Sequence, residues 1–282
     1  MIVVTGADGL VGRAVCERLH QVKLPVLPVV RARRADSVAG ASVVDLVAET
    51  IPVAGDVRGV IHLAAAVPHS PQYPDTDGTA QLTRRIDQRI RKFVQQHTCP
   101  IVYASSCSLY DPATPEPKHE DTSPVRARTP YFAGKLDGER LFAECGAVIA
   151  RLSNPVGPHL PPVLVLSRFI GTAADDGSIE IWGTGSREQD FVDARDVARF
   201  LCDAVMRPVA GTFNVASGRA TRMDQLAATV VEVVRRGAVR RVDIADPEET
   251  RTARYSIEKV RSVYGWIPQY SLADAIRSVV AC

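Results

Sequence analysis

The 282-residue chain has no apolar run long enough to span a membrane, and it has no block of like charges. Its formal net charge at pH 7 is only +2, and its basic residues are spread along the sequence. A nucleic-acid-binding surface would be more strongly basic, so neither nucleic acid nor a membrane is expected as a partner. The sequence also opens on a β-branched run, which is unlike a signal peptide.

Closely spaced cysteine pairs are missing as well. The six cysteines are scattered without a CxxC pair, at Cys16, Cys99, Cys107, Cys145, Cys202 and Cys282. Most have apolar neighbours, which indicates reduced thiols in the core of a cytoplasmic protein. No metal site is expected, because the cysteines have no ligand spacing.

The feature that organises the chain is its first stretch, MIVVTGADGLVG. Residues 2–4 are typical of a short buried parallel strand, and residues 13–19 have apolar positions at helical spacing. Between them, Gly6 would make a tight turn, Gly9 would admit a pyrophosphate, and Gly12 would let the helix pack closely on the strand. This pattern predicts a dinucleotide site at the helix N-terminus, the alternative being a glycine turn that only packs.

The end of the second predicted strand, residues 25–30, bears on the choice of dinucleotide. An acidic residue there would bind the two ribose hydroxyls of NAD, whereas an arginine suits the 2′-phosphate of NADP. The chain has Arg31 at this position, with Arg33 and Arg34 just beyond and Arg13 near the glycine turn. NADP(H) is therefore favoured and NAD(H) remains possible. The alternative is that these are solvated arginines on a loop.

Strands and helices alternate through the first half of the chain. Further strands are predicted at 42–46, 60–66, 101–104 and 148–150, and helices at 75–97 and from Tyr131 onward. This order predicts an α/β fold, a Rossmann-type doubly wound parallel sheet. Within the 60–66 strand, His62 is expected to be a hydrogen-bonded core residue.

A change of texture at Pro158 predicts two regions. Residues 1–157 would form the dinucleotide-binding Rossmann domain, to which a later segment at about 183–220 returns. The remainder of 158–282, rich in prolines and short elements, would form mainly a smaller C-terminal substrate-binding lobe.

With these residues laid out, the chain resembles the extended short-chain dehydrogenase/reductase family, which includes nucleotide-sugar epimerases, dehydratases and reductases. The matching motifs run nearly end to end: TGADGLVG (5–12), DL (45–46), HLAA (62–65), SSCSLY (105–110), YFAGK (131–135), RLSNPVGP (151–158), WGTGSREQDFVDARDVA (182–198), GTFNVASG (211–218) and YGWIPQYSLADAI (264–276). Several motifs in the family's order make the resemblance more specific than any one of them.

The resemblance implies a site for each partner in the reaction. The catalytic residues would be Ser106, Tyr131 and Lys135. The cofactor would contact Gly6, Gly9, Leu10, Val11, Gly12, Arg31, Arg33, Asp45, Leu46, Leu63, Ala64, Ala65, Tyr131, Lys135 and Pro155. The small-molecule substrate would contact Ser108, Asn154, Arg187 and Arg251. A tyrosine has a pKa of about 10, so the ammonium of Lys135 would be needed to lower the pKa of Tyr131 toward neutral pH.

Several positions depart from the family's pattern. Cys107 and Ser108 replace the Asp–Glu pair of sugar 4,6-dehydratases, so dehydration is disfavoured. Gln189 stands where an arginine often clamps a nucleotide diphosphate, and Asp75 replaces an asparagine. These departures weaken the expectation of a nucleotide sugar more than that of redox chemistry.

The sequence therefore predicts an NADPH-dependent ketoreductase acting on a nucleotide-activated 4-keto-6-deoxysugar. An NAD-dependent nucleotide-sugar 4-epimerase and a ketoreductase for a polyketide or other secondary metabolite are the alternatives within enzymes. A catalytically silent NADP-binding regulator is disfavoured because Tyr131 and Lys135 are both present. By resemblance, the helices at about 75–97 and 130–145 would pair two subunits into a homodimer.

Overall fold

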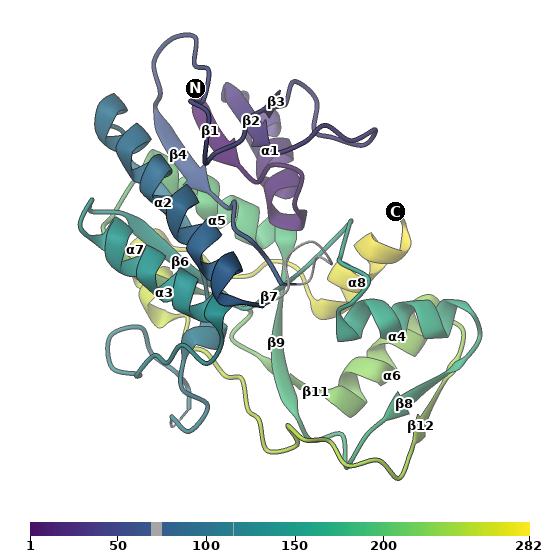
Figure 1. Ribbon diagram of the computed structural model, residues 1–282. Coiled ribbons are helices and arrows are strands. Elements are labelled where there is room, and N and C mark those ends of the chain that lie inside the picture. The colour runs from purple at the N-terminus through teal and green to yellow at the C-terminus, as the bar shows by residue number, and fades with distance from the viewer. Residues whose placement is uncertain (69–74, 115) are drawn as a thin grey trace.

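The computed structural model describes residues 1–68, 75–114 and 116–282 (Figure 1). Its centre is a seven-stranded sheet in which neighbouring strands run parallel. In spatial order the strands are β10 (Gly211–Val215), β6 (Val148–Leu152), β5 (Ile101–Ser106), β4 (Gly59–His62), β1 (Ile2–Thr5), β2 (Val26–Val30) and β3 (Ser42–Val43). The predicted doubly wound α/β fold is confirmed.

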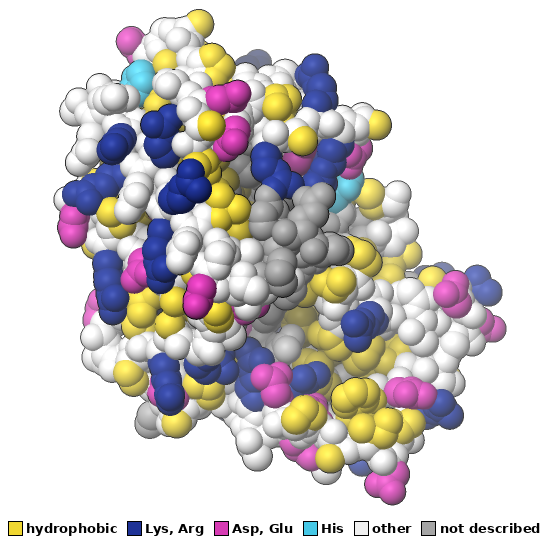
Figure 2. Space-filling view, viewed as in Figure 1, with side chains coloured by type: hydrophobic (Ala, Val, Ile, Leu, Met, Phe, Trp, Pro, Cys, Tyr) yellow, Lys and Arg dark blue, Asp and Glu magenta, His cyan; other side chains and the backbone are white. Residues whose placement is uncertain are grey.

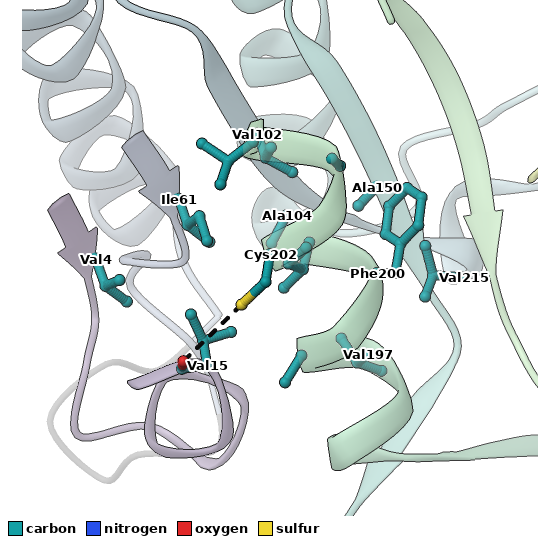
Figure 3. Packing of buried hydrophobic residues seen from close by; sticks show 14 of the residues in the cluster. Val4, Val15, Ile61, Val102, Ala104, Ala150, Val197, Phe200, Cys202 and Val215 are labelled. Carbon is teal, nitrogen blue, oxygen red and sulfur yellow. Dashed lines mark hydrogen bonds between the residues drawn. The ribbon is translucent and has the colours of Figure 1, made fainter. Parts of the chain in front are cut away.

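Helices cover both faces of this sheet because its strands are apolar on both sides. Ile2 and Val4 face the layer formed by α1 (Leu10–Gln21) and α5 (Ala194–Met206). Val3 faces the layer formed by α2 (Asp77–His97) and α3 (Pro130–Ala143). Figure 3 shows Phe200 of α5 next to Ala150 and Val215 of the sheet, and the Cys202 sulfur directed at the Val15 carbonyl of α1.

The second region packs around its own core, at the lower right of Figure 1. Its helices are α4 (Val165–Ala174), α6 (Met223–Val234) and α8 (Leu272–Val280), beside a parallel pair of strands, β8 (Ser178–Ile181) and β12 (Ala238–Arg241). A three-stranded sheet of β7 (Asn154–Val156), β9 (Glu188–Asp193) and β11 (Ala220–Arg222) lies next to it. The chain returns to the main sheet through α5 and β10, and α7 (Glu258–Tyr264) packs on β10.

Two predicted strands are shorter than expected, and hydrogen bonds explain both. The 42–46 strand ends at Val43, because Asp45 starts a turn in which its carboxylate accepts the Val47 N–H. The 60–66 strand ends at His62, where the Leu63 N–H is shared between the carbonyl and side-chain oxygens of Thr5 and the Ala64 N–H donates to the Thr5 side chain. His62 is fully buried and hydrogen-bonded through both ring nitrogens, as predicted.

All six cysteines lie in the described part of the chain and are unpaired. Cys16, Cys99, Cys107 and Cys202 are buried as expected, but Cys145 is half-buried and Cys282 is exposed at the C-terminus. The described residues include no group of three acidic, histidine or cysteine side chains able to hold a metal ion. Nor do they include a helix with both the length and the apolarity to cross a membrane.

Candidate functional site

The glycine turn between β1 and α1 is closely packed. Gly6 has a φ of +69°, and a β-carbon there would lie 2.9 Å from the backbone nitrogen of Ala64. A β-carbon on Gly12 would lie 2.3 Å from the Gly6 carbonyl oxygen, and one on Gly9 would lie 3.2 Å from that same oxygen. A side chain at Gly6 would push the turn away from the end of β4, and one at Gly12 would collide with the turn's own backbone, while Gly9 is tightly packed against it. The turn therefore fits a pyrophosphate cradle.

Replacing Gly12 by alanine is expected to weaken dinucleotide binding about tenfold or more, since overpacking costs about 1–3 kcal/mol. The measurement is a nicotinamide fluorescence titration. Gly171→Ala is the matched control, because a β-carbon on this other helical glycine would meet nothing within 4 Å. Wild-type affinity in the Gly12 variant would contradict the cradle.

A cavity of about 640 Å³ opens beside this turn, at the carboxyl ends of β1, β2 and β4. Successive strands are added on one side of β1 up to β3 and on the other side from β4 onward. Doubly wound sheets bind ligands at this edge, next to the point where the strand order changes side. Eight of the predicted cofactor residues line the cavity: Gly6, Gly9, Arg31, Asp45, Leu46, Leu63, Ala64 and Ala65. Its size and its glycine and alanine walls fit the adenosine half of a dinucleotide, and we refer to it below as the adenosine cavity.

The remaining predicted cofactor residues lie elsewhere. Leu10, Val11 and Gly12 form the first turn of α1 and are not part of the cavity wall. Arg33 is exposed and also outside the cavity wall. Tyr131, Lys135 and Pro155 belong to α3 and β7, beyond the cavity's lining residues.

Three arginines line the cavity, Arg31, Arg34 and Arg85, together with Asp8 and Asp45. Arg85 was not predicted, because it comes from α2, far along the sequence from the other two. The only sequence signal for this position of Arg85 is its helical spacing from Leu82 and Ile86, which places the three residues on one face of α2. Lys and Arg side chains are also frequent on the side of the molecule that carries α2 and α3 (Figure 2).

Arg13, which the sequence placed with the arginines for a 2′-phosphate, is not among the residues that line the cavity. Its guanidinium donates to the carboxylate and carbonyl of Asp36 and to the Asp8 carbonyl. The side chain therefore fastens the loop after β2 to the glycine turn.

The predicted catalytic residues come from two packed elements, β5 and α3. Ser106 is the last residue of β5. Its Oγ accepts the N–H of Ser108 at 3.1 Å, and this hydrogen bond caps the start of the 3-10 helix η1 (Cys107–Leu109). Thr129 caps α3 with its side chain, and Pro130 occupies the first turn, where its missing N–H is harmless. Lys135 is buried one turn later, and its Nζ donates to the Ala104 carbonyl of β5 at 2.8 Å.

The electrostatics at Tyr131 differ from the expectation. Its backbone N–H donates to the Asp75 carboxylate at 2.7 Å. Burial of the ring and this carboxylate raise the pKa of Tyr131 to about 12. Burial lowers the pKa of Lys135, while the carboxylates of Asp87 and Glu139 oppose that fall. In this state Tyr131 is a neutral phenol, and the Lys135 ammonium is directed at Ala104.

The predicted substrate-binding residues are engaged with other protein groups. The Arg187 guanidinium pairs with Asp246 at 3.2 Å and with Glu248 at 3.2 Å. Arg251 pairs with the same Glu248 at 3.0 Å. The Asn154 amide donates to the Asp190 carbonyl at 2.7 Å.

The two arginines are therefore not arranged as free anion-binding groups. The paired carboxylates lie about 60 positions along the chain from Arg187, so sequence proximity gave no sign of the pairing. Ser108 is part of η1, where its carbonyl accepts from Arg128 at 3.1 Å.

Comparison with known proteins is consistent with this geometry. The model of the NAD dependent epimerase/dehydratase family matches residues 2–216. UDP-glucose 4-epimerase of Mycolicibacterium smegmatis is 29% identical over 319 residues, which cover 99% of this chain and 96% of that protein. dTDP-D-glucose 4,6-dehydratase of Bos taurus is 24% identical over 69% of this chain, which spans only 56% of that enzyme.

Solved structures share the fold over nearly the whole chain. A UDP-glucose 4-epimerase from Thermotoga maritima, solved with UDP-glucose, superposes with a TM-score of 0.83 at 19% identity, covering 99% of this chain and 97% of that one. MoeE5 in complex with UDP-glucose and NAD has a TM-score of 0.80 at 22% identity, with the same coverage. At these identities the likeness establishes the fold.

Proposed function

The chain belongs to the NAD dependent epimerase/dehydratase family, and on that premise we propose that it is an NADP(H)-dependent oxidoreductase that reduces a ketone on a small molecule. The observation that carries the proposal is the arginine lining of the adenosine cavity. Arg31 occupies the end of β2, where an acidic side chain would bind a ribose diol, and Arg34 and Arg85 line the same wall. A 2′-phosphate is the group that this charge suits.

The catalytic groups have complementary parts in this proposal. A bound dinucleotide supplies the hydride. Tyr131 donates its phenolic proton to the oxygen of the substrate carbonyl. Its raised pKa keeps the phenol protonated but makes it a weak acid, so nearby positive charge has to lower that pKa for efficient transfer. One lone pair of the Ser106 hydroxyl oxygen accepts the Ser108 N–H. The Ser106 O–H can therefore donate to the same substrate oxygen. Lys135 supplies the positive charge beside this proton transfer.

Elimination of water is not part of the proposal. Cys107, at the first position of the dehydratase acid–base pair, is buried, and its thiol donates to the Arg151 carbonyl at 3.1 Å. Burial raises the pKa of this thiol well above its usual range. A neutral, enclosed thiol cannot act as acid or base near neutral pH.

A nucleotide-sugar 4-epimerase using NAD(H) is the second candidate. It is favoured by the match of almost full length to the mycobacterial UDP-glucose 4-epimerase. The pairing of Arg187 and Arg251 with Glu248 favours instead a substrate bound without a diphosphate clamp, such as a secondary-metabolite ketone. A homodimer through α2 and α3 is part of either proposal.

Arg31→Asp tests the cofactor assignment. We expect it to weaken NADPH binding about 10- to 100-fold and to leave NADH binding nearly unchanged, because a charge-assisted hydrogen bond is worth about 1.5–3 kcal/mol. Parallel fluorescence titrations with both dinucleotides give the measurement.

Arg33→Asp is the matched control for that titration. It makes the same charge reversal two residues away, outside the cavity wall, and should preserve the NADPH preference. Equal affinity of the wild type for both dinucleotides would overturn the NADP(H) assignment. NAD(H) retained through purification would make the epimerase the leading function.

A further inference from the structure

A chain of buried polar groups runs from the glycine turn toward Lys135. Thr5 Oγ1 lies 2.6 Å from His62 Nδ1, and His62 Nε2 lies 2.9 Å from Asp87 Oδ1. Tyr103 donates its O–H to the other oxygen of Asp87 at 3.3 Å. All four side chains are at most 1% exposed. The catalytic scheme proposed above uses none of them.

The hydrogen-bond donors around Thr5 indicate how His62 is held. Thr5 Oγ1 lies 3.2 Å from the backbone nitrogens of both Leu63 and Ala64, and the Leu63 nitrogen also lies 3.3 Å from the Thr5 carbonyl oxygen. With these N–H groups on its lone pairs, the Thr5 hydroxyl donates to Nδ1, and Nε2–H donates to Asp87. In this arrangement His62 serves Asp87 as a hydrogen-bond donor.

Lys135 is the cation that Asp87 influences, because the Asp87 carboxylate raises the pKa of Lys135 against the effect of burial. Its Nζ lies 4.8 Å from the centre of the Tyr103 ring, whose hydroxyl bonds to Asp87. Close packing of α3 leaves no room for another group, since a β-carbon on Gly138 would lie 2.6 Å from Asp87 Oδ2.

The other acidic side chain near Lys135 is already neutralised. Glu139, one turn further along α3, accepts two hydrogen bonds from Arg151, at 2.9 and 2.7 Å. Among the phenols, that of Tyr103 faces Lys135 with its ring, and Tyr131 lies one turn earlier on α3. Of the two acidic neighbours, Asp87 is the one that pairs with no arginine in the described part of the chain, its recorded partner being the His62 imidazole.

We propose that Asp87 is a positioning residue that acts as the buried counter-ion of Lys135, held in place by His62 and Tyr103. A buried anion is stabilised by hydrogen bonds and by a nearby cation, and each of the two charges here lacks water. Through Thr5 the same network holds the N–H groups of Leu63 and Ala64, which lie against the glycine turn. The proposal rests on the role given to Lys135 in the proposed function.

Direct titration of Lys135 in the dinucleotide-free protein tests the proposal. The chain has five lysines, so labelling with [13Cε]lysine gives five resonances, and the Lys135 signal is the one lost in Lys135→Met. An opposite charge nearby moves a pKa by about one to three, so we expect the pKa of Lys135 to fall by about one or more in Asp87→Asn. Asparagine keeps the size of the side chain and its acceptor for His62.

Two variants sharpen this measurement. Asp137→Asn removes a half-exposed carboxylate from α3, the helix that carries Lys135, and should leave the Lys135 titration in place. His62→Gln should also leave it in place, because in the proposed network His62 serves Asp87 only as a hydrogen-bond donor. A rise in the Lys135 pKa in His62→Gln would show that a charged imidazole had been balancing Asp87, which would overturn the proposal. So would equal shifts in the Asp87 and Asp137 variants.

The wild type provides a second test that does not depend on folding of a variant. A buried lysine without a counter-ion titrates at about pH 5–6, whereas the pairing proposed here should hold the pKa of Lys135 well above that range. A Lys135 transition below neutral pH would refute the pairing. No turnover is needed, so failure of the pairing and failure of the proposed reaction are distinguished.

Discussion

Replacing Tyr131 by phenylalanine is expected to lower kcat by about 10²- to 10⁴-fold, the usual contribution of a positioned acid or base. The substitution removes only the phenolic oxygen, and the backbone N–H that holds Asp75 at the start of α3 remains. Dinucleotide binding should change little, because Tyr131 lies outside the adenosine cavity wall. Turnover is followed by nicotinamide absorbance for reduction, or by sugar analysis for epimerisation.

Tyr270→Phe is the matched control, since it removes a hydroxyl from an exposed ring that stacks with Arg195 and should leave turnover unchanged. Turnover retained by the Tyr131 variant would remove this residue from the acid–base role under both candidate functions. A large loss of dinucleotide affinity would instead assign Tyr131 to cofactor binding.

Replacing Arg151 by methionine is expected to lower the free energy of unfolding by about 3–5 kcal/mol, the cost of leaving one charge of a buried pair alone. Arg151 on β6 and Glu139 on α3 are bonded at two atom pairs, and their side chains are only 6% and 7% exposed. Glu139 also accepts the Ser105 hydroxyl next to Ser106, so the pair ties α3 to the end of β5. Urea denaturation followed by circular dichroism gives the measurement.

The same substitution at Arg84 is the control. Arg84 pairs with Asp137 between α2 and α3 at 2.6 Å, but the two side chains are 40% and 38% exposed. Water screens such a pair, so Arg84→Met should cost no more than about 1 kcal/mol. Equal losses in the two variants would show that burial does not set the contribution of these pairs.

The sequence by itself was enough for the sheet and the glycine turn. Residues 2–12 contain the strand, the turn and the start of the helix in one local stretch. Gly9 and Gly12 are required by contacts with the backbone of that stretch, and Gly6 by contacts with the backbone of residues 63–64. The alternation of apolar strands and helices likewise determines a parallel sheet with two covered faces, because each strand is apolar on both sides. Element ends were less accurate, since Asp45 and Thr5 form hydrogen bonds that interrupt the strand pattern.

Tertiary structure alone decided which charges remain for ligands. Arg187 looks like an anion-binding residue in its motif, but Asp246 and Glu248 come from a distant segment and neutralise it. Arg85 lines the cavity beside the glycine turn only because α2 packs beside β4. Asp87 and Lys135 likewise belong to two helices, α2 and α3, that are brought together only by packing. Local sequence determines the face on which a side chain lies, whereas its partner there depends on packing between segments far apart in the chain.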